Sequence, residues 1–178
     1  MRNKIIIFTD GASKGNPGPG GFGAVIVLPE DEACPNLSQG RVVELGGSEK
    51  HTTNNRMELA GAIMALGEIL KREEDVLVYT DSKYLIGGMT EWIFNWQKNG
   101  WRSAAKKAVA NQDLWEKLAE LSKGKKINYH YVAGHVGVKG NERCDEIASG
   151  LATGENISLY NGALSKYKIN ILDLGRNE

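Results

Sequence analysis

Two short segments of this chain share one pattern, an apolar run rich in β-branched residues that stops at Thr-Asp. Ile5–Phe8 leads to Asp10 and Val76–Tyr79 leads to Asp81, with a threonine before each aspartate. Runs of this kind are typical of buried strands. If both strands lie side by side and parallel, their aspartates emerge together at one edge of a sheet, where α/β proteins commonly bind ligands. Taken singly, either aspartate is an ordinary turn residue or helix cap.

The remaining periodicity predicts an α/β fold built on one sheet. Gly15–Gly21 holds two prolines and four glycines, so we expect a turn there rather than a strand or helix. Three leading strands favour antiparallel pairing and the later alternation favours parallel additions, which predicts a mixed five-stranded sheet with helices on both faces. Further strands are expected at Phe22–Leu28, Arg41–Leu45 and Ile127–Val132, and helices at Asn54–Leu70, Ser82–Gly87, Glu91–Gln97, Gln112–Leu121 and Asn141–Leu151.

Composition narrows the possible functions without selecting one. Lysine plus arginine and aspartate plus glutamate both number 22, so any contact with nucleic acid must come from a local patch. No apolar stretch approaches the roughly 20 residues of a membrane span, and Ile5–Phe8 is too short for a signal peptide. Cys34 and Cys144 form no CxxC pair and cannot build a disulfide framework. We therefore expect a cytoplasmic monomer with no membrane association.

Two further acids stand in helix-like segments. Glu58 lies between apolar neighbours and could face inward, although an acid near a helix start is also favoured by the macrodipole. Asp145 lies inside the last expected helix, where aspartate has poor propensity. Four carboxylates share a small site only if cations neutralise them, and all-oxygen ligands favour Mg²⁺ or Mn²⁺ over zinc. Two such ions about 4 Å apart can position a water and stabilise the leaving oxygen of a phosphodiester.

Four motifs in this order, TDGxxxGNPGPGG, TTNNRMEL, YTDS and HxGxxGNERCDE, resemble those of the type 1 ribonuclease H family over roughly residues 4–152. The resemblance implies hydrolysis of the RNA strand of RNA–DNA hybrids, giving 3′-hydroxyl and 5′-phosphate ends. It implies a catalytic domain at 1–152, followed by a C-terminal extension at 153–178 that we expect to pack on the same domain. It also implies two Mg²⁺ ions, with Mn²⁺ as the alternative, held by Asp10, Glu58, Asp81 and Asp145, and a loop histidine, His135, that aids proton transfer or product release.

The resemblance also implies which residues contact the hybrid. Telling RNA from DNA requires contacts to the 2′-hydroxyl, which both donates and accepts hydrogen bonds. The side-chain amides of Asn16, Asn54 and Asn55 suit that role and match family positions in the RNA-strand groove. Without the resemblance, Asn16 is an ordinary turn residue and Asn54 a helix cap. Thr53 and Asn111 are similar to the family's phosphate pocket on the DNA strand. Departures from the family pattern, which bear on substrate affinity rather than on the metal site, occur at Ser13, His51, Lys83 and Gly87.

The segment from Trp92 to Gln112 is basic in an otherwise neutral protein, with no acid and with interleaved tryptophans. Basic residues neutralise phosphates, and flat aromatic rings pack on sugars and bases. An ordinary surface loop with its tryptophans turned into the core would show the same pattern. Likeness to a basic protrusion that grips the DNA strand in many family members favours binding. The residues concerned are Trp92, Trp96, Lys98, Trp101, Arg102, Lys106 and Lys107.

Other interpretations of the sequence are weaker. Gly18–Gly23 matches GxGxxG, but a strand-like run follows it, so a dinucleotide site lacks its structural context. His130 and His135 have no CxxC partner, which disfavours zinc. Two alternatives stay open: a DNA-cleaving nuclease of the same fold, and a catalytically silent nucleic-acid-binding module. The asparagines and tryptophans argue against the first, and the presence of all four acids argues against the second.

Overall fold

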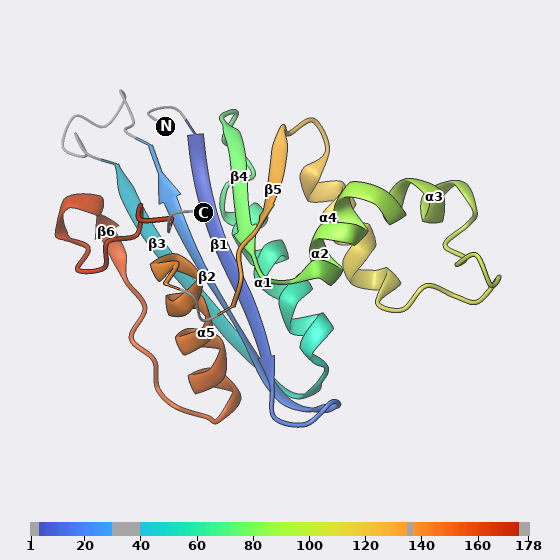
Figure 1. Cartoon of the computed structure of the whole chain (residues 1–178), viewed down its shortest axis with the longest axis horizontal. Coiled ribbons are helices and arrows are strands. Elements are labelled where there is room, and N and C mark those ends of the chain that lie inside the picture. The colour runs from blue at the N-terminus through green and yellow to red at the C-terminus, as the bar shows by residue number, and fades with distance from the viewer. Residues whose placement is uncertain (1–3, 30–39, 135–136, 175–178) are drawn as a thin grey trace.

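The computed structural model describes residues 4–29, 40–134 and 137–174, which fold around one mixed sheet (Figure 1). The strand order is β5-β4-β1-β2-β3-β6. β1 runs parallel to β4 and β4 parallel to β5, while the other neighbours are antiparallel. The strands are β1 (Lys4–Ser13), β2 (Gly18–Leu28), β3 (Arg41–Thr52), β4 (Asp75–Thr80), β5 (Ile127–Tyr131) and β6 (Asn161–Ala163).

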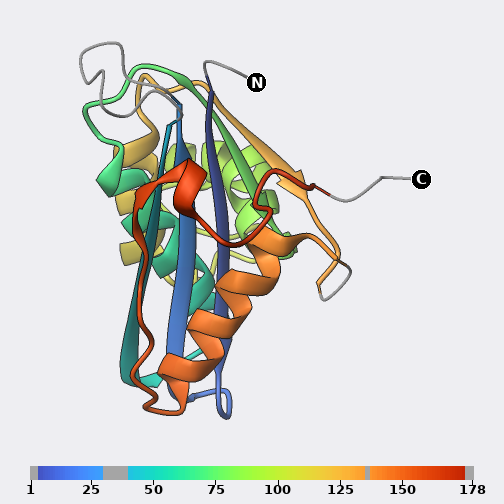
Figure 2. The ribbon, with the colours of Figure 1, turned by 90° about the vertical axis from the view of Figure 1, so that its left-hand side faces the viewer.

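Helices cover both faces of this sheet, which confirms the expected α/β class. Figure 2 shows α5 in front of the sheet and the other helices behind it. Among the described residues, no helix is both long and apolar enough to cross a membrane. The helices are α1 (Asn54–Glu68), α2 (Lys83–Gly87), α3 (Ile93–Lys98), α4 (Gln112–Ser122) and α5 (Lys139–Ala152), with a π-helical turn η2 (Gly88–Trp92) that joins α2 to α3 and a 3-10 turn η3 (Leu164–Lys166).

The alternation of side chains along β1 divides the core into two layers. Ile5 and Ile7 pack with the apolar side chains of α1 and α4. Ile6 and Phe8 point to the other face and pack with Cys144 of α5. Because both faces are covered, β1 is apolar on both sides from Ile5 to Phe8, as the unbroken run predicts.

Three strands are longer than the sequence predicts. β1 continues through Thr-Asp to Ser13, and β2 already begins at Gly18, so only the first part of Gly15–Gly21 is the expected turn. β3 ends at Thr52 rather than at Leu45. The reason is the antiparallel pairing itself: β1 stays hydrogen-bonded to β2 to its end, and β3 stays paired with β2 over its whole length. Such pairing overrides local turn preference, which composition alone cannot reveal.

A sixth strand corrects the five-stranded sheet expected from the sequence. β6 pairs with β3, with Val42 opposite Gly162, and comes from the chain after α5. Beyond it, Ile171 is only 1% exposed and belongs to the core layer under α5. Figure 2 shows this segment crossing the same face of the sheet as α5. From the sequence, the segment Ser158–Leu174 could add a strand or wrap the domain, and β6 lies within it; its three residues, Asn-Gly-Ala, carry no strand periodicity that would decide between the two.

Lys125 holds the chain just after α1. Its ammonium donates hydrogen bonds to the carbonyl oxygens of Ile69, Leu70 and Arg72, at 3.0, 3.2 and 2.7 Å. Backbone acceptors at a helix C-terminus lack helical partners, and a cation there also complements the helix dipole. Lys125 therefore fixes the end of α1 to the start of β5.

We expect Lys125→Met to lower the free energy of unfolding by about 1–3 kcal/mol, because backbone acceptors lose a charged donor. Methionine keeps much of the apolar stem. Lys126→Met is the matched control: its ammonium pairs with Asp75 at 2.8 Å, but the side chain is 73% exposed, so we expect a loss under about 1 kcal/mol. Urea denaturation followed by circular dichroism measures both. Equal losses would show that Lys125 does not hold this helix end.

Candidate active site

Asp10 lies on β1 just beyond the end of its pairing with β4, where β1 is still paired with β2. The parallel pairing of β1 with β4 ends at Phe8 and Tyr79, but β1 continues beside β2, where Asp10 pairs with Gly23. β4 itself ends one residue before Asp81. The parallel neighbours expected from the two Thr-Asp segments are therefore present, and they bring both aspartates to the same edge of the sheet.

Glu58 joins the aspartates from the first turns of α1. Thr53 caps this helix by accepting a hydrogen bond from the Arg56 amide at 3.4 Å. The helix lies directly on β1 at Gly11, where a Cβ atom would stand 2.3 Å from the Glu58 nitrogen. Only glycine allows so close an approach. This contact sets Glu58 beside Asp10.

Asp10, Glu58 and Asp81 form a group that we call the carboxylate cluster. One oxygen from each lies within 4.8 Å of the others, and Asp10 and Glu58 are 7% and 6% exposed. The Gly11 amide donates to Asp10 Oδ1 at 2.7 Å, and Asn54 Nδ2 donates to Glu58 Oε1 at 3.3 Å. The buried Oε2 of Glu58 has no hydrogen-bond partner. A bound cation would satisfy that oxygen, so the cluster fits a divalent metal with oxygen ligands.

Burial and mutual repulsion disfavour the ionised carboxylates. Burial raises the pKa of Asp10 from 3.8 to about 7, with further contributions from Asp81 and Asp145. Burial, followed by the charges of Asp10 and Asp81, raises the pKa of Glu58 well above its usual value. A divalent cation would act in the opposite direction, because it stabilises the charged form. The cluster is therefore electrostatically prepared for a cation.

Asp145 approaches from the other face of the sheet. α5 packs on β2 at Gly23, where a Cβ atom would stand 2.3 Å from the Cys144 carbonyl oxygen. Asp145 follows Cys144, and its charge contributes to the raised pKa of Asp10. Its Oδ1 accepts a hydrogen bond from Ser149 at 3.1 Å. Within the described part of the chain, the 4.8 Å cluster contains the other three acids, so the fourth expected acid lies outside that limit.

His135, the remaining expected catalytic residue, lies outside the described residues. Its neighbour Gly134 lies against the cluster, since a Cβ atom there would stand 2.7 Å from Asp81 Oδ2. The chain therefore reaches the carboxylate cluster one residue before His135.

The asparagines expected to contact RNA lie next to the carboxylate cluster. The Asn54 amide donates to Asn16 Oδ1 at 3.3 Å, which joins the start of α1 to the exposed turn between β1 and β2. The side chain of Asn54 donates in turn to Glu58. Asn55 is exposed on the first turn of α1. Asn54 thus connects the predicted RNA contacts with the cluster.

A polar network joins the starts of α1 and α4. Arg56 donates to Asp113 at 3.1 and 2.8 Å and to Asn111 Oδ1 at 3.4 Å. Asn111 Nδ2 donates to the Tyr84 hydroxyl at 3.2 Å. Because Thr53 accepts from the Arg56 amide, both residues expected at the phosphate pocket belong to this network. Arg56 was not among the site residues predicted from the sequence, although its place in TTNNRMEL was an available signal.

The basic segment, Trp92–Gln112, comprises α3 and the loop that leads to α4, and it lies at one end of the molecule (Figure 1). Trp96 and Trp101 are half-buried, and the Trp96 ring lies 6.5 Å from Trp101 and 5.5 Å from Trp115 of α4. Trp101, Lys106 and Asn111 adopt positive φ angles of 59–60°, which cost roughly 1–2 kcal/mol per residue. Aromatic packing therefore holds the loop in a defined shape. The exposed expected contacts are Trp92, Lys98, Arg102, Lys106 and Lys107.

Comparison with known proteins decides the family. Residues 2–153 match the family described as RNase H. The chain belongs to the ribonuclease H family. The ribonuclease H of Francisella tularensis subsp. novicida is 49% identical over 148 residues, which cover 83% of this chain and 90% of that protein. The ribonuclease H of Francisella philomiragia is 47% identical over the same shares. The resemblance stated from the sequence motifs is confirmed.

Solved structures agree with this assignment. LC9-RNase H1, described as a type 1 RNase H with the type 2 active-site motif, superposes with a TM-score of 0.76 at 28% identity. The superposition covers 90% of this ribonuclease H and 78% of the LC9 chain. LC11-RNase H1 in complex with an RNA/DNA hybrid superposes with a TM-score of 0.54 at 25% identity, over 82% of this chain and 94% of that one.

The stability of this ribonuclease H without metal should depend on pH through Asp10. The pKa of Asp10 is about 7 in the folded protein against an ordinary value of 3.8, so the folded state holds the proton more tightly. The stabilisation that comes from this bound proton is complete below about pH 4 and is lost as the pH rises through 7. Asp10→Asn mimics the protonated form. We expect its melting temperature in EDTA to exceed that of the wild type by an amount that grows between pH 4 and 7, at about 2–4 °C per kcal/mol.

Differential scanning calorimetry over this pH range measures the effect. As the control, saturating Mg²⁺ at pH 8 should raise the melting temperature of the wild type and have a much smaller effect on Asp10→Asn, because ligand binding stabilises only the folded state that binds it. If the two proteins melted at the same temperature at every pH in EDTA, Asp10 would not be destabilised by its neighbours.

Proposed function

We propose that this protein is an endonuclease that hydrolyses the RNA strand of RNA–DNA hybrids. The observation that carries the proposal is the carboxylate cluster, with a partnerless buried oxygen on Glu58, in a chain of the ribonuclease H family. The structure of LC11-RNase H1 with an RNA/DNA hybrid supports a hybrid as the substrate. The cluster argues against a silent binding module, which has no need of repelling carboxylates.

The donor set indicates a hard divalent cation as the cofactor. Asp10, Glu58 and Asp81 offer oxygen atoms alone, which suit Mg²⁺ and Mn²⁺ rather than zinc. We propose two ions, with Asp145 completing the donor set from α5. Ions held by these carboxylates would supply Lewis-acid chemistry, which makes a nearby water more acidic and offsets negative charge on the leaving oxygen. Direct attack of water on phosphorus leaves 3′-hydroxyl and 5′-phosphate ends.

Groups of the chain itself hold the carboxylates in a fixed orientation. The Gly11 amide binds one oxygen of Asp10, and the Asn54 side chain binds one oxygen of Glu58. Each of the two carboxylates still offers an oxygen to the common site, and outer contacts of this kind tune metal affinity. We propose that His135 transfers a proton or assists product release, and the contact of Gly134 with Asp81 supports placing this loop at the cluster.

Recognition of the RNA strand is proposed for the asparagines. Asn16 and Asn54 are joined by a hydrogen bond, and Asn55 is exposed on the first turn of α1. Their amides would contact the 2′-hydroxyls of neighbouring ribonucleotides, which duplex DNA lacks. Because Asn54 also binds Glu58, the group that senses the ribose touches a proposed metal ligand. This contact favours cleavage of RNA over DNA.

Recognition of the DNA strand is proposed for two surfaces. Thr53 and Asn111 would bind a backbone phosphate, within the network that Arg56 and Tyr84 build. The basic segment would follow the strand further, since its exposed cations neutralise phosphates. Its positive-φ residues support this role, because backbone strain of this kind gathers at functional sites. The proposed contacts in the segment are Trp92, Trp96, Lys98, Trp101, Arg102, Lys106 and Lys107.

We expect Asp10→Asn and Glu58→Gln each to reduce cleavage of an RNA–DNA hybrid by at least about 10³-fold while the fold is retained. An amide in place of a carboxylate removes a charge that attracts the cations, and metal-based stabilisation is worth several kcal/mol. The measurement is a gel assay with and without Mg²⁺, with circular dichroism as the folding control. Duplex DNA and single-stranded RNA are the matched substrates. Near-normal turnover of either variant, or efficient cutting of duplex DNA, would contradict the proposal.

The basic segment should act through binding. Replacing Lys98, Arg102, Lys106 and Lys107 by alanine leaves up to four phosphates without a cation, so the slope of log K against log salt should flatten by roughly 0.9 for each of these phosphates. Interactions made equally in ground and transition states change KM more than kcat. Steady-state kinetics between about 50 and 200 mM salt measure both effects. Trp96→Ala or Trp101→Ala should weaken binding with less dependence on salt, because stacking is not screened.

A matched control removes the same charge elsewhere. Lys4, Lys71, Lys123 and Lys126 are exposed and lie near the start of β1, the end of α1 and the starts of β4 and β5, away from the cluster. The fourfold alanine variant at these positions should keep the wild-type KM and salt slope. If the two fourfold variants behaved alike, only net charge would matter, and the basic segment would not grip the DNA strand.

A further inference from the structure

The chain after α5 lies outside the family match, which ends at residue 153. It nevertheless forms part of the core. β6 pairs with the first residues of β3, and Ile171 packs at 1% exposure in the layer formed by Ile6, Val25 and their neighbours. Figure 2 shows this segment lying across the face of the sheet beside α5. The C-terminal extension is thus built onto the same layer as the helix that carries Asp145.

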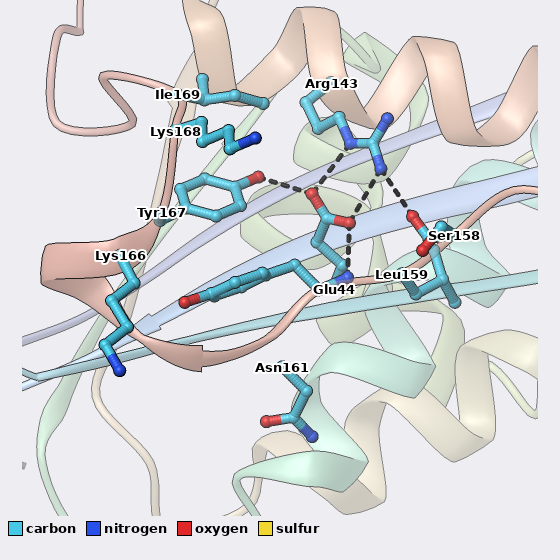
Figure 3. Close-up of a pocket in the computed structure, with 10 residues that line it drawn as sticks. Glu44, Arg143, Ser158, Leu159, Asn161, Lys166, Tyr167, Lys168 and Ile169 are labelled. Carbon is cyan, nitrogen blue, oxygen red and sulfur yellow. Dashed lines mark hydrogen bonds and ion pairs between the residues drawn. The ribbon is translucent and has the colours of Figure 1, made fainter.

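Glu44 of β3 ties the extension to α5 (Figure 3). Its side chain is 1% exposed. Glu44 Oε1 accepts hydrogen bonds from Arg143 Nε at 2.8 Å and from the Tyr167 hydroxyl at 2.5 Å. Glu44 Oε2 accepts from Arg143 Nη2 at 2.9 Å and from the Tyr160 backbone amide at 2.8 Å. We call the side chains of Glu44, Arg143 and Tyr167, together with the backbone amide of Tyr160, the clamp.

The clamp fixes geometry more than it adds stability. The Arg143 guanidinium is held on three sides, because it also donates to the Ser158 carbonyl oxygen at 3.0 Å and pairs with Glu146 at 2.9 Å. A bidentate arginine–carboxylate pair has one preferred geometry. Burying such a pair costs about as much as its attraction returns, so its net contribution to stability is small. The main effect of a buried and fully hydrogen-bonded pair of this kind is therefore to fix the orientation of the groups that it joins.

The flank of α5 that the clamp holds is opposite to the flank that carries Asp145. Cys144 is fully buried and faces the sheet at Gly23. Successive residues are about 100° apart around a helix, so Arg143 and Asp145 project to the two sides of Cys144. A roll of about 20° would displace a group about 5 Å from the helix axis by roughly 2 Å. Mg²⁺ requires oxygen distances near 2.1 Å with little tolerance.

We propose that the clamp is a positioning device that sets the rotation of α5 and thereby brings Asp145 to the carboxylate cluster. Tyr160 and Tyr167 make the C-terminal extension part of this device. The position of Asp145 supports the idea, because Asp145 lies outside the 4.8 Å group and is carried on α5 beside Cys144, the residue that contacts Gly23. The inference rests on the proposed metal site.

Two tyrosine-to-phenylalanine variants test the clamp. Tyr167→Phe removes the hydroxyl that binds Glu44. Tyr160→Phe removes a hydroxyl that binds the Ala163 carbonyl oxygen at 2.7 Å, while the backbone bond of Tyr160 to Glu44 remains. Both keep the ring, both lose one hydrogen bond, and both lie in the extension. They differ in the acceptor that is lost, which is the Glu44 carboxylate for Tyr167 and the Ala163 carbonyl oxygen for Tyr160.

The readout is the dissociation constant for Mg²⁺, a concentration obtained by fitting the rise in melting temperature over a series of Mg²⁺ concentrations, measured beside hybrid cleavage. We expect Tyr167→Phe to raise this concentration roughly three- to tenfold, at or below the usual effect of changing a residue that directly supports a metal ligand. Glu44→Gln should give a larger change in the same direction, and Tyr160→Phe a change of less than about twofold. Each variant should still melt cooperatively, and the metal-free melting temperatures show the purely structural cost.

One result would overturn the inference and leave the proposed function intact. If the wild type cleaved hybrids and responded to Mg²⁺, while Tyr167→Phe and Glu44→Gln matched Tyr160→Phe in their dissociation constants for Mg²⁺, the clamp would serve stability alone. A wild type whose melting temperature did not respond to Mg²⁺ would overturn both the clamp and the metal site. A selective effect of Tyr167→Phe and Glu44→Gln would support the positioning role.

Discussion

The repulsion among three carboxylates within 4.8 Å is the constraint around which this structure is organised. Burial adds to it, since Asp10 and Glu58 are almost inaccessible to water that could screen their charges. These like charges stay together because the backbone beneath them is rigid. β1 and β4 are hydrogen-bonded to each other up to the cluster, and β1 is bonded to β2 beyond it.

The acids come from different layers of the fold, and this arrangement couples the site to the packing. Glu58 depends on the contact of α1 with Gly11 on one face, and Asp145 on the contact of α5 with Gly23 on the other. Each glycine lets a helix backbone approach the sheet more closely than any side chain would permit. A cation bound by these acids would therefore link both helix layers through the sheet, and metal binding would stabilise the whole domain.

The sequence predicted those parts of the site that depend on residues close together in the chain. The Thr-Asp endings predicted the parallel pair β1 and β4, and helical spacing predicted that Glu58 lies near the start of α1. What the sequence could not predict depends on partners far along the chain. Arg56 binds residues 55 and 57 positions away, and Glu44 binds residues 99 to 123 positions away. No periodicity or motif within one segment reports such pairs, and β6 is too short to have any.

The sequence left two interpretations of the tryptophans open, as core residues or as substrate contacts. The structure makes the two compatible. Trp92 is 37% exposed, whereas Trp96 and Trp101 are half-buried and packed toward Trp115. The same rings can therefore anchor the basic segment and present an edge to a strand of nucleic acid. An anchored loop gives up less conformational entropy on binding than a mobile one. Under the proposed role, the four cations would meet phosphates from a preformed surface, and a local patch of this kind would let a protein of zero net charge hold a polyanion.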